Sequence, residues 1–281
     1  MKPDGRPERN VRAGTKRAEG SATALPRSLA PPTWLGTLPF LGVLLAWWLL
    51  PRVVQYPAYM LPSIAAVLDF ARESLQDGTL LRNVLASLAR LFAGFAIGMA
   101  LAVPLGLAIA LNRVVSDMFR PVLSFLQAIA GIAWVPLTII WFGIGNGSVV
   151  FVIANTIFFA SLYNTVVGVQ SIPTSLYRAV RSHGGSGLAL LTNLILPGAL
   201  VQLLLGVRTS MAYGWRALVA SEMIAGSSGL GYMTMEAVQW QRTDVIILGM
   251  IVIGLLWVVM DRFIFTAIER RTVGRWGLLQ R

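Results

Sequence analysis

The chain has 281 residues, of which 56% are hydrophobic and only 12% are charged, and its mean hydropathy is +0.70. A soluble domain carries about 25% charged residues, so the composition excludes a water-soluble globule and predicts a polytopic membrane protein. There is no cysteine, which excludes disulfides, thiolate nucleophiles and cysteine-ligated metals. The single histidine, His183, excludes a multi-histidine metal site and leaves any Ser-His-Asp triad dependent on that one residue.

The net charge of +11 is concentrated at the two ends of the chain. Seven of the 23 Lys and Arg residues lie in the first 27 positions, and five lie in the last 20. Basic residues beside apolar segments are typical of cytoplasmic membrane flanks, and they also attract an anionic lipid bilayer. No basic stripe is interleaved with aromatic residues, so we expect no nucleic acid as a partner.

Residues 1–30 are rich in Gly, Ala, Ser, Pro and Arg and show no hydrophobic period. They are predicted to form a disordered basic cytoplasmic tail. The tail is long for a secretory signal peptide, and the apolar segment that follows it lacks a small-residue cleavage site, so we expect a retained first span. The remainder, 31–281, is predicted to be one transmembrane domain.

The apolar windows predict an all-α protein with about six transmembrane helices, five or seven being the alternatives, since a span needs about 20 apolar residues. No charged residue occurs from Pro121 to Tyr177, which is enough for two spans. Glycines in the segment 143–148 predict the turn between them. The predicted spans lie near 34–50, 91–111, 121–142, 149–169, 188–224 and 245–267.

The distribution of positive charge predicts the orientation. With the N-terminus inside, the cytoplasmic segments carry 16 Lys and Arg residues and the outer segments carry 5. This asymmetry favours both termini in the cytoplasm, and an even number of spans agrees with that arrangement.

An outer segment, 62–76, has an apolar face at helical spacing. It is predicted to be an interfacial helix, with a ligand-contacting lid as the alternative. The predicted face holds Val67, Phe70, Ala71 and Leu75.

The cytoplasmic loop 171–196 predicts a short helix that Pro173 opens and Gly184-Gly185 closes. Pro197 then begins the next span. A short amphipathic helix exposed to the cytosol suits insertion into a groove on another protein; a helix lying on lipid headgroups is the alternative. Its apolar face holds Leu176, Ala179 and Val180.

This loop resembles the cytoplasmic loop of binding-protein-dependent ABC importer permeases, whose pattern is Glu-Ala-Ala, three residues, Gly, nine residues and Ile-x-Leu-Pro. Arg178 stands where that family has glutamate, and Val180 replaces the second alanine. The first change reverses a charge, so a salt bridge that the family makes there does not carry over. The residues on the pattern are Arg178, Ala179, Val180, Gly184, Leu194, Leu196 and Pro197.

The resemblance extends over about residues 55–275. In this region the sequence is similar to the nitrate/sulfonate/taurine branch of these permeases. Many fragments occur in the right order, which makes the resemblance specific. They include Leu61-Pro62-Ser63, Ser87–Phe95, Gly206-Val207-Arg208, Ala220–Ile224 and Gly229–Tyr232.

The resemblance implies a type I importer permease in the cell inner membrane, acting as a pair that is expected to be a homodimer. It implies that an extracytoplasmic binding protein delivers a small anionic substrate such as nitrate, a sulfonate or taurine. It also implies that loop 171–196 carries a coupling helix that docks on a separate ATP-binding subunit. A P-loop requires Gly-x-x-x-x-Gly-Lys-Ser/Thr, and the only lysines are Lys2 and Lys16. We therefore expect no cofactor, metal or catalytic residue in this chain, with ATP bound by the partner.

Three residues are candidates for the translocation pathway or a gate: Arg208, Trp215 and Glu222. Intramembrane charges usually face a cavity or a partner, although both charges also suit the headgroup zone. Arg208 and Glu222 are 14 residues apart, about 21 Å along one helix, so they cannot pair with each other. Trp134 and Met211 suit either the pathway or simple packing.

Three other classes of protein remain as alternatives. A gradient-driven secondary transporter would couple through intramembrane acids, and a membrane enzyme would need a polar constellation at one membrane face. Its loop, 171–196, holds no acidic residue that could orient His183 for such a site. The reversed charge at Arg178 motivates the third class, a non-transporting membrane scaffold.

Overall fold

The computed structural model describes residues 38–53, 57 and 60–265, in two compact units, Met1–Val53 and Val54–Arg281. The predicted tail, 1–30, lies outside the described residues, so its boundary stays a prediction. In the first unit, α1 (Leu38–Val53) matches the predicted first span, whose start also lies outside the described residues.

Every regular element in the described part of the second unit is helical, which confirms the all-α class. Short turns of other helix types occupy Gly131–Trp134, Leu191–Ile195 and Asp261–Phe265. The α-helices are α2 (Ile64–Gln76), α3 (Thr79–Leu111), α4 (Arg113–Ala128), α5 (Val135–Phe142), α6 (Asn146–Gln170), α7 (Thr174–Ser182), α8 (Leu188–Leu190), α9 (Leu196–Ala225), α10 (Leu230–Gln239) and α11 (Thr243–Met260).

Four helical segments in the described residues are long and apolar enough to cross a membrane: 79–111, 146–170, 188–225 and 243–263. If the bent pair of α4 and α5 counts as one span, the described residues contain up to five spans. The apolar part of α1, Leu41–Pro51, is a shorter helix. The predicted count of six is therefore approximate.

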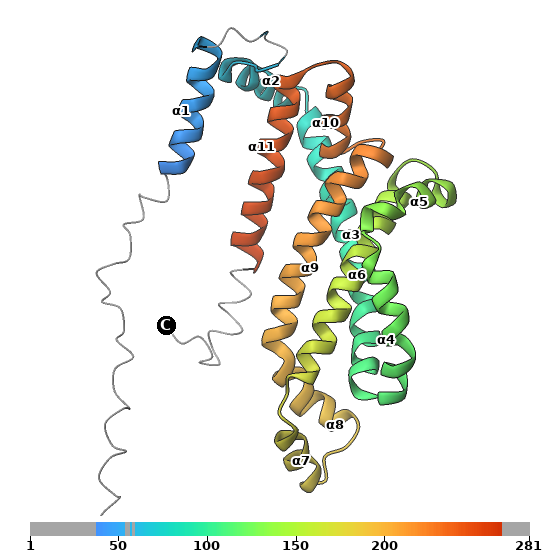
Figure 1. The fold of residues 1–281 in the computed structure, drawn as a ribbon. Helices are drawn as coiled ribbons and strands as arrows, with labels where there is room; N and C mark the ends of the chain where they lie inside the picture. Colours follow the sequence, from blue (N-terminus) through green and yellow to red (C-terminus); the bar gives the residue numbers. More distant parts are fainter. Residues whose placement is uncertain (1–37, 54–56, 58–59, 266–281) are drawn as a thin grey trace, which may run out of the picture. The chain divides into compact units, whose positions relative to one another are not determined.

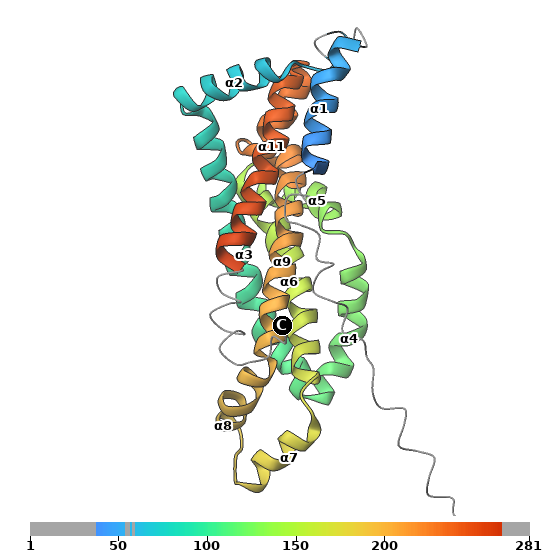
Figure 2. The ribbon, with the colours of Figure 1, turned by 90° about the vertical axis from the view of Figure 1, so that its left-hand side faces the viewer.

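Helices α3, α6 and α9 run side by side and form the centre of the second unit (Figures 1 and 2). Small residues bring α3 close to α6, because Gly94, Gly98 and Gly106 recur at a spacing of four or eight along one face. A Cβ added at Gly98 would lie 2.8 Å from the carbonyl oxygen of Ala154. Only glycine permits this approach of the two backbones.

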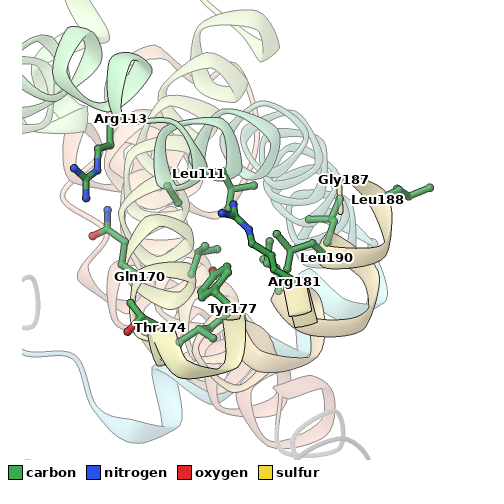
Figure 3. A pocket seen from close by; sticks show the side chains of 14 residues that line it. Leu111, Arg113, Gln170, Thr174, Tyr177, Arg181, Gly187, Leu188 and Leu190 are labelled. Atoms are coloured by element: carbon green, nitrogen blue, oxygen red, sulfur yellow. The ribbon is translucent and has the colours of Figure 1, made fainter. Parts of the chain in front are cut away.

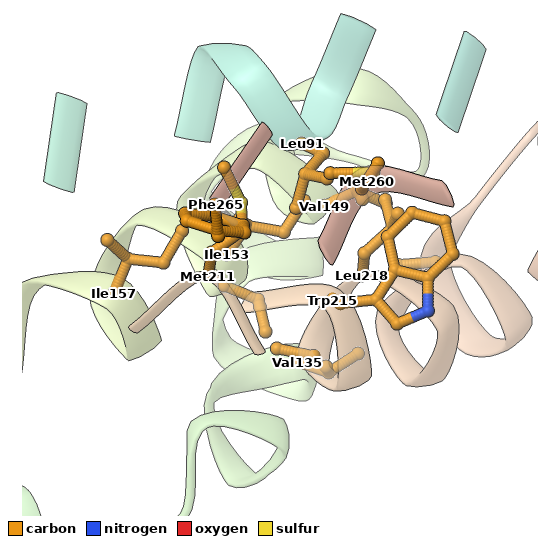
Figure 4. Close-up of a cluster of buried hydrophobic side chains, with 13 residues drawn as sticks. Leu91, Val135, Val149, Ile153, Ile157, Met211, Trp215, Leu218, Met260 and Phe265 are labelled. Carbon is orange, nitrogen blue, oxygen red and sulfur yellow. The ribbon is translucent and has the colours of Figure 1, made fainter. Parts of the chain in front are cut away.

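The hydrophobic core of the second unit lies where these three helices meet (Figure 4). Leu91 of α3, Ile153 and Ile157 of α6 and Leu218 of α9 are fully buried there. Since lipid is as apolar as these side chains, close packing rather than exclusion of water holds the helices together.

The span predicted near 121–142 is interrupted rather than continuous. The chain forms α4 from Arg113, breaks at residues 129–130, and continues into α5 at an angle of 86°. The reason is that α4 is amphipathic rather than apolar all round, since polar side chains recur at heptad spacing along one face. These are Arg113, Asp117, Arg120, Ser124 and Gln127.

Two further boundaries matter for the site. The predicted second span began at Leu91, with Arg90 in the outer segment, but α3 already begins at Thr79 and places Arg90 inside the helix. The interfacial helix is present as α2, and Ser63 caps it by accepting the backbone N–H of Ala66 at 3.2 Å. Its buried face includes Ser74 instead of the predicted Leu75, which is exposed.

The two ends of the second unit carry different structures. Helices α2 and α10 lie at one end, and α7 and α8 lie at the opposite end (Figure 1). The predicted turn within 143–148 is confirmed, because Gly143 and Gly145 have positive φ angles of 73° and 134°. These two ends provide the outer and cytoplasmic faces of the predicted orientation.

Candidate functional site

The segment 171–196, hereafter the coupling loop after its predicted role, contains the predicted short helix, α7. The helix ends at Ser182, and Gly184 follows with a φ angle of 79°, a conformation that residues with a side chain rarely adopt. The N–H of Gly184 donates to the carbonyl of Arg181 at 3.0 Å, and that of Gly185 donates to the carbonyl of Val180 at 3.0 Å. This glycine turn sets where α7 ends and how it is presented.

Helix α7 is buried on one side only. Tyr177 and Val180 pack against a buried cluster that includes Ile172 and Ile195. Arg178 and Ala179, by contrast, are exposed. The exposed side is therefore available to a partner, and it carries the arginine that replaces the glutamate of the resembling permeases.

The other residues on the permease pattern lie where the coupling loop rejoins the bundle. Leu196 begins α9 and is exposed, and Pro197 is in the first turn of that helix. Proline is tolerated there because its missing N–H is one that a helix start leaves unpaired. Leu194 is buried in the same cluster as Val180.

A cavity of about 730 Å³ lies between the coupling loop and the adjacent ends of α3 and α6 (Figure 3). Its lining includes Arg113, Tyr177 and Arg181. Partial burial raises the pKa of the Tyr177 phenol. The cavity is bordered by α7 on one side and by the ends of α3 and α6 on the other.

Glu222, a candidate pathway or gate residue, lies at the opposite end of the bundle in a buried ion pair. Its carboxylate accepts from Arg90 Nη1 at 2.7 Å, and the two side chains are 0% and 5% exposed. Ser87 donates to the same carboxylate at 2.8 Å, and the backbone N–H of Gly231 donates at 3.0 Å. The structure thus gives Glu222 a full set of partners within the chain.

Arg90 links this ion pair to two further segments. Its Nε donates to Asn146 Oδ1 at 2.7 Å, at the start of α6. Its Nη1 donates to the carbonyl of Ser228 at 2.6 Å, in the turn between α9 and α10. Arg90 and Glu222 therefore connect α3, α6, α9 and α10 at one place.

Arg208 and Trp215 are held by different surroundings. Arg208 makes two hydrogen bonds of 2.7 Å with the carboxylate of Asp261, at the end of α11, and both side chains are partly exposed. Trp215 is buried in the core, with its ring centroid 6.3 Å from that of Trp257. The structure does not bring Arg208, Trp215 and Glu222 together, and their role in a pathway or gate stays a prediction.

Of the two residues left open between pathway and packing, Met211 is buried in the core. Trp134 is half-buried in the turn between α4 and α5, with its ring centroid 6.4 Å from that of Phe151. Its indole N–H is enclosed and has no acceptor among the described residues.

A second cavity, of about 600 Å³, is lined with neutral polar side chains. We call it the polar cavity. It lies where the break between α4 and α5 faces α6 and α9, so a non-helical segment borders it, as occurs where backbone lines a cavity inside a membrane protein. Its polar lining consists of Gln127, Asn155, Thr156, Tyr163, Asn164, Thr209 and Tyr213.

Sequence reasoning missed Arg90 and the polar cavity for identifiable reasons. A charge at the edge of an apolar window has two readings: it can mark the end of a span, or it can be buried with a partner. Nothing near Arg90 in the sequence identifies its partner, which lies 132 positions away. The polar lining residues of α6 form two pairs eight positions apart, Asn155-Thr156 and Tyr163-Asn164. That spacing was the available signal for the cavity. It was not recognised because none of these side chains is charged.

The sequence of this chain is similar to those of known transport proteins. Residues 102–273 match the family described as binding-protein-dependent transport system inner membrane component. The chain is 32% identical over 251 residues to the taurine transport system permease protein of Escherichia coli, covering 88% of this chain and 90% of that protein. It is 33% identical over 189 residues to the bicarbonate transport system permease protein of Synechococcus elongatus, covering 67% and 68% of the two chains.

The fold is similar to that of a solved transporter. A chain of the MetNI methionine ABC transporter, in an inward facing conformation, superposes with a TM-score of 0.56 at 20% identity, covering 69% of this chain and 97% of that one. The matched family consists of transport permeases and not of enzymes. The chain belongs to the binding-protein-dependent transport system inner membrane components, within the nitrate/sulfonate/taurine branch of ABC importer permeases.

Proposed function

We propose that this chain forms the translocation pathway for a small anion that an extracytoplasmic binding protein delivers and that a separate ATP-binding subunit drives across the inner membrane. The observation that carries the proposal is the exposed side of α7, presented on the Gly184 turn at one end of the bundle. A short amphipathic helix on a rigid turn is a means of docking in a groove of another protein.

The docking contact has an unusual charge. Arg178 is exposed on α7 and stands at the glutamate position of the resembling permeases. A cation there favours a groove with an acidic side chain, whereas a glutamate favours a basic one. We infer that the ATP-binding partner of this chain carries a complementary acidic residue.

The anionic substrate class draws on the relatives. One is a taurine permease and another a bicarbonate permease; taurine carries a sulfonate, and bicarbonate is an oxyanion. Membership of the same branch supports a small oxyanion for this chain. A second copy of the chain is the partner that we propose for the permease pair, because the permeases that this chain resembles act as pairs.

The orientation proposed for the chain has both termini in the cytoplasm. It places the coupling loop inside, where the ATP-binding subunit resides, and the ion pair of Arg90 and Glu222 near the outer face. The excess of 16 Lys and Arg residues over 5 supports that orientation.

Affinity purification from native membranes in a mild detergent tests the proposal. We expect a P-loop ATPase and a second copy of this chain to co-purify, and uptake of labelled taurine, an alkanesulfonate or bicarbonate to depend on the catalytic residues of that ATPase. Recovery of this chain without an ATPase, under conditions that preserve other importers, would contradict the proposal. Uptake that instead requires a proton or sodium gradient would establish the secondary-transporter alternative.

A further inference from the structure

Helix α9 turns a polar stripe toward the polar cavity. Thr209 and Tyr213 both line the cavity, and Arg216 continues the stripe at the next turn. The three residues stand at positions i, i+4 and i+7, so they share one face of the helix. Arg208 lies on another face, where it pairs with Asp261.

Arg216 is an arginine well inside the membrane-spanning segment. It is nine residues from the end of α9 at Ala225, about 14 Å along the axis. It is exposed in the single chain, and the only contact recorded for its guanidinium within the described residues is the face of the Tyr213 ring, whose centroid lies 5.8 Å from Cζ. An intramembrane charge is costly unless it faces a water-filled cavity or a partner, and the neighbouring polar cavity supplies the first of these.

The other charged residues of α9 are satisfied within the chain. Glu222 pairs with Arg90, and Arg208 pairs with Asp261. For Arg216, by contrast, no carboxylate lies within ion-pair distance in the described part of the chain. The guanidinium of Arg216 is therefore available to interact with a group outside the described part of the chain.

The chemistry of the cavity fits an anion. Among the described residues that line it, none is acidic. Amide and hydroxyl groups, as on Asn155 and Thr156, donate hydrogen bonds to oxyanions without adding charge. The tyrosine ring holds the guanidinium by a cation–π contact, which leaves its N–H donors free to reach a ligand.

We propose that Arg216, positioned by Tyr213 beside the polar cavity, binds anions there and selects for oxyanions on their way through the membrane. The inference rests on the proposed function, because it assigns a subsite within the proposed pathway. A single cation among neutral donors attracts a sulfonate or bicarbonate, yet it holds the anion weakly enough for release, as conduction requires.

The absence of cysteine makes this subsite directly measurable, since one introduced cysteine is the only thiol of the chain. Thr209→Cys places a thiol of similar size in the cavity, seven residues before Arg216. The assembled importer in proteoliposomes is treated with two methanethiosulfonates, one carrying an ethylsulfonate and one carrying a trimethylammonium group. The labelling rate of this chain is then followed by mass spectrometry.

We expect the sulfonate reagent to label Thr209→Cys with a marked preference over the cationic reagent. Arg216→Gln should lower the ratio of the two rates by about tenfold, because a focused charge changes the local ion concentration by at least that factor. Arg216→Lys keeps the charge and should keep most of the preference. A distant reporter, Gln76→Cys in α2, should show no effect of Arg216→Gln.

An unchanged ratio in Arg216→Gln would overturn the proposal, and it would indicate that Arg216 pairs with an acidic residue of a second copy. A thiol at position 209 that neither reagent labels in any nucleotide state would also overturn it, because the cavity would then exclude water. The labelling ratio needs no uptake. A charge-dependent ratio in an assembly whose uptake does not depend on the ATPase would thus refute the proposed function while leaving the anion subsite in place.

Discussion

The ion pair of Arg90 and Glu222 is enclosed by four helices, so each charge depends on the other to replace the water that it has lost. Removing one partner of a buried pair is strongly destabilising, typically by about 3–5 kcal/mol, because the remaining charge is left uncompensated. Glu222 also accepts from Ser87 and Gly231, so it cannot be replaced by an apolar side chain without leaving those donors unpaired.

We predict that Arg90→Met lowers the free energy of unfolding by about 3 kcal/mol. The double variant Arg90→Met with Glu222→Gln should recover part of this loss, since the amide still accepts hydrogen bonds but leaves no buried anion. Thermal unfolding of the purified chain in detergent measures both changes. A double variant that is less stable than Arg90→Met would refute the interpretation of the pair as mutually compensating.

Arg178 tests the docking surface at the level of one side chain. It is exposed on α7, so Arg178→Glu should leave the stability of the chain within about 0.5 kcal/mol of its original value. If the groove of the ATP-binding subunit carries an acid, the same change should weaken co-purification of that subunit by about tenfold or more, because like charges then meet. Arg72→Glu, in α2 at the opposite end of the bundle, is the matched control. Equal recovery of the subunit with all variants would exclude Arg178 from the interface.

At the scale of helices, α3 and α6 can approach closely because glycines, which have no side chain, lie between them. A Cβ at Gly98 would approach Ala154 O and Ile157 to 2.8 and 2.9 Å. We predict that Gly98→Leu separates the two helices and sharply reduces the amount of folded chain in the membrane. Gly254→Ala, in α11, meets nothing within 4 Å and should be tolerated. Quantified membrane abundance and the thermal midpoint compare the two, and equal losses would contradict the packing argument.

The turn after α7 depends on backbone conformation instead of packing. Nothing lies within 4 Å of a Cβ at Gly184, but its φ angle of 79° strains most residues. We predict that Gly184→Glu uncouples ATP hydrolysis from uptake by displacing α7, whereas Gly184→Asn retains coupling, because Asn tolerates the left-handed region. Parallel uptake and ATPase assays on the assembled importer measure this. Normal uptake by a fully assembled Gly184→Glu importer would show that the turn does not present α7.

The elements that sequence patterns predicted well are those with a strong local signal. The long apolar runs of α3, α6 and α11 and the glycine turns at 143–148 and 184–185 needed no knowledge of distant contacts. The break between α4 and α5 was missed because residues 121–142 are uncharged throughout, and a window average does not detect a change of direction. The amphipathic pattern that begins at Arg113 was the signal that a longer window would have included.

At the scale of the whole molecule, the paired charges come from segments far apart in the chain. Arg90 and Glu222 are separated by 132 positions, and Arg208 and Asp261 by 53. The distribution of charged residues along the sequence shows which of them lie close to membrane spans. It does not show which of them form ion pairs with one another. Helix packing decides this, and packing is specified by the fit of many side chains at once. For that reason, the coupling loop was predictable from the sequence, whereas the buried ion pair and the polar cavity were not.

The orientation of the whole chain is also testable with single cysteines. Gln76 in α2 and Ser175 in α7 are both exposed and lie at opposite ends of the second unit (Figure 2). The excess of positive charge predicts that Ser175 faces the cytoplasm and Gln76 the outside. In right-side-out vesicles, a membrane-impermeant maleimide should label Gln76→Cys and spare Ser175→Cys; in inverted vesicles the pattern should reverse. Permeabilised vesicles, in which both sites label, confirm that each thiol is accessible. Labelling of Ser175→Cys from the outside would place the coupling loop on the wrong side for an ATP-binding partner, and would refute the proposed importer architecture together with the orientation.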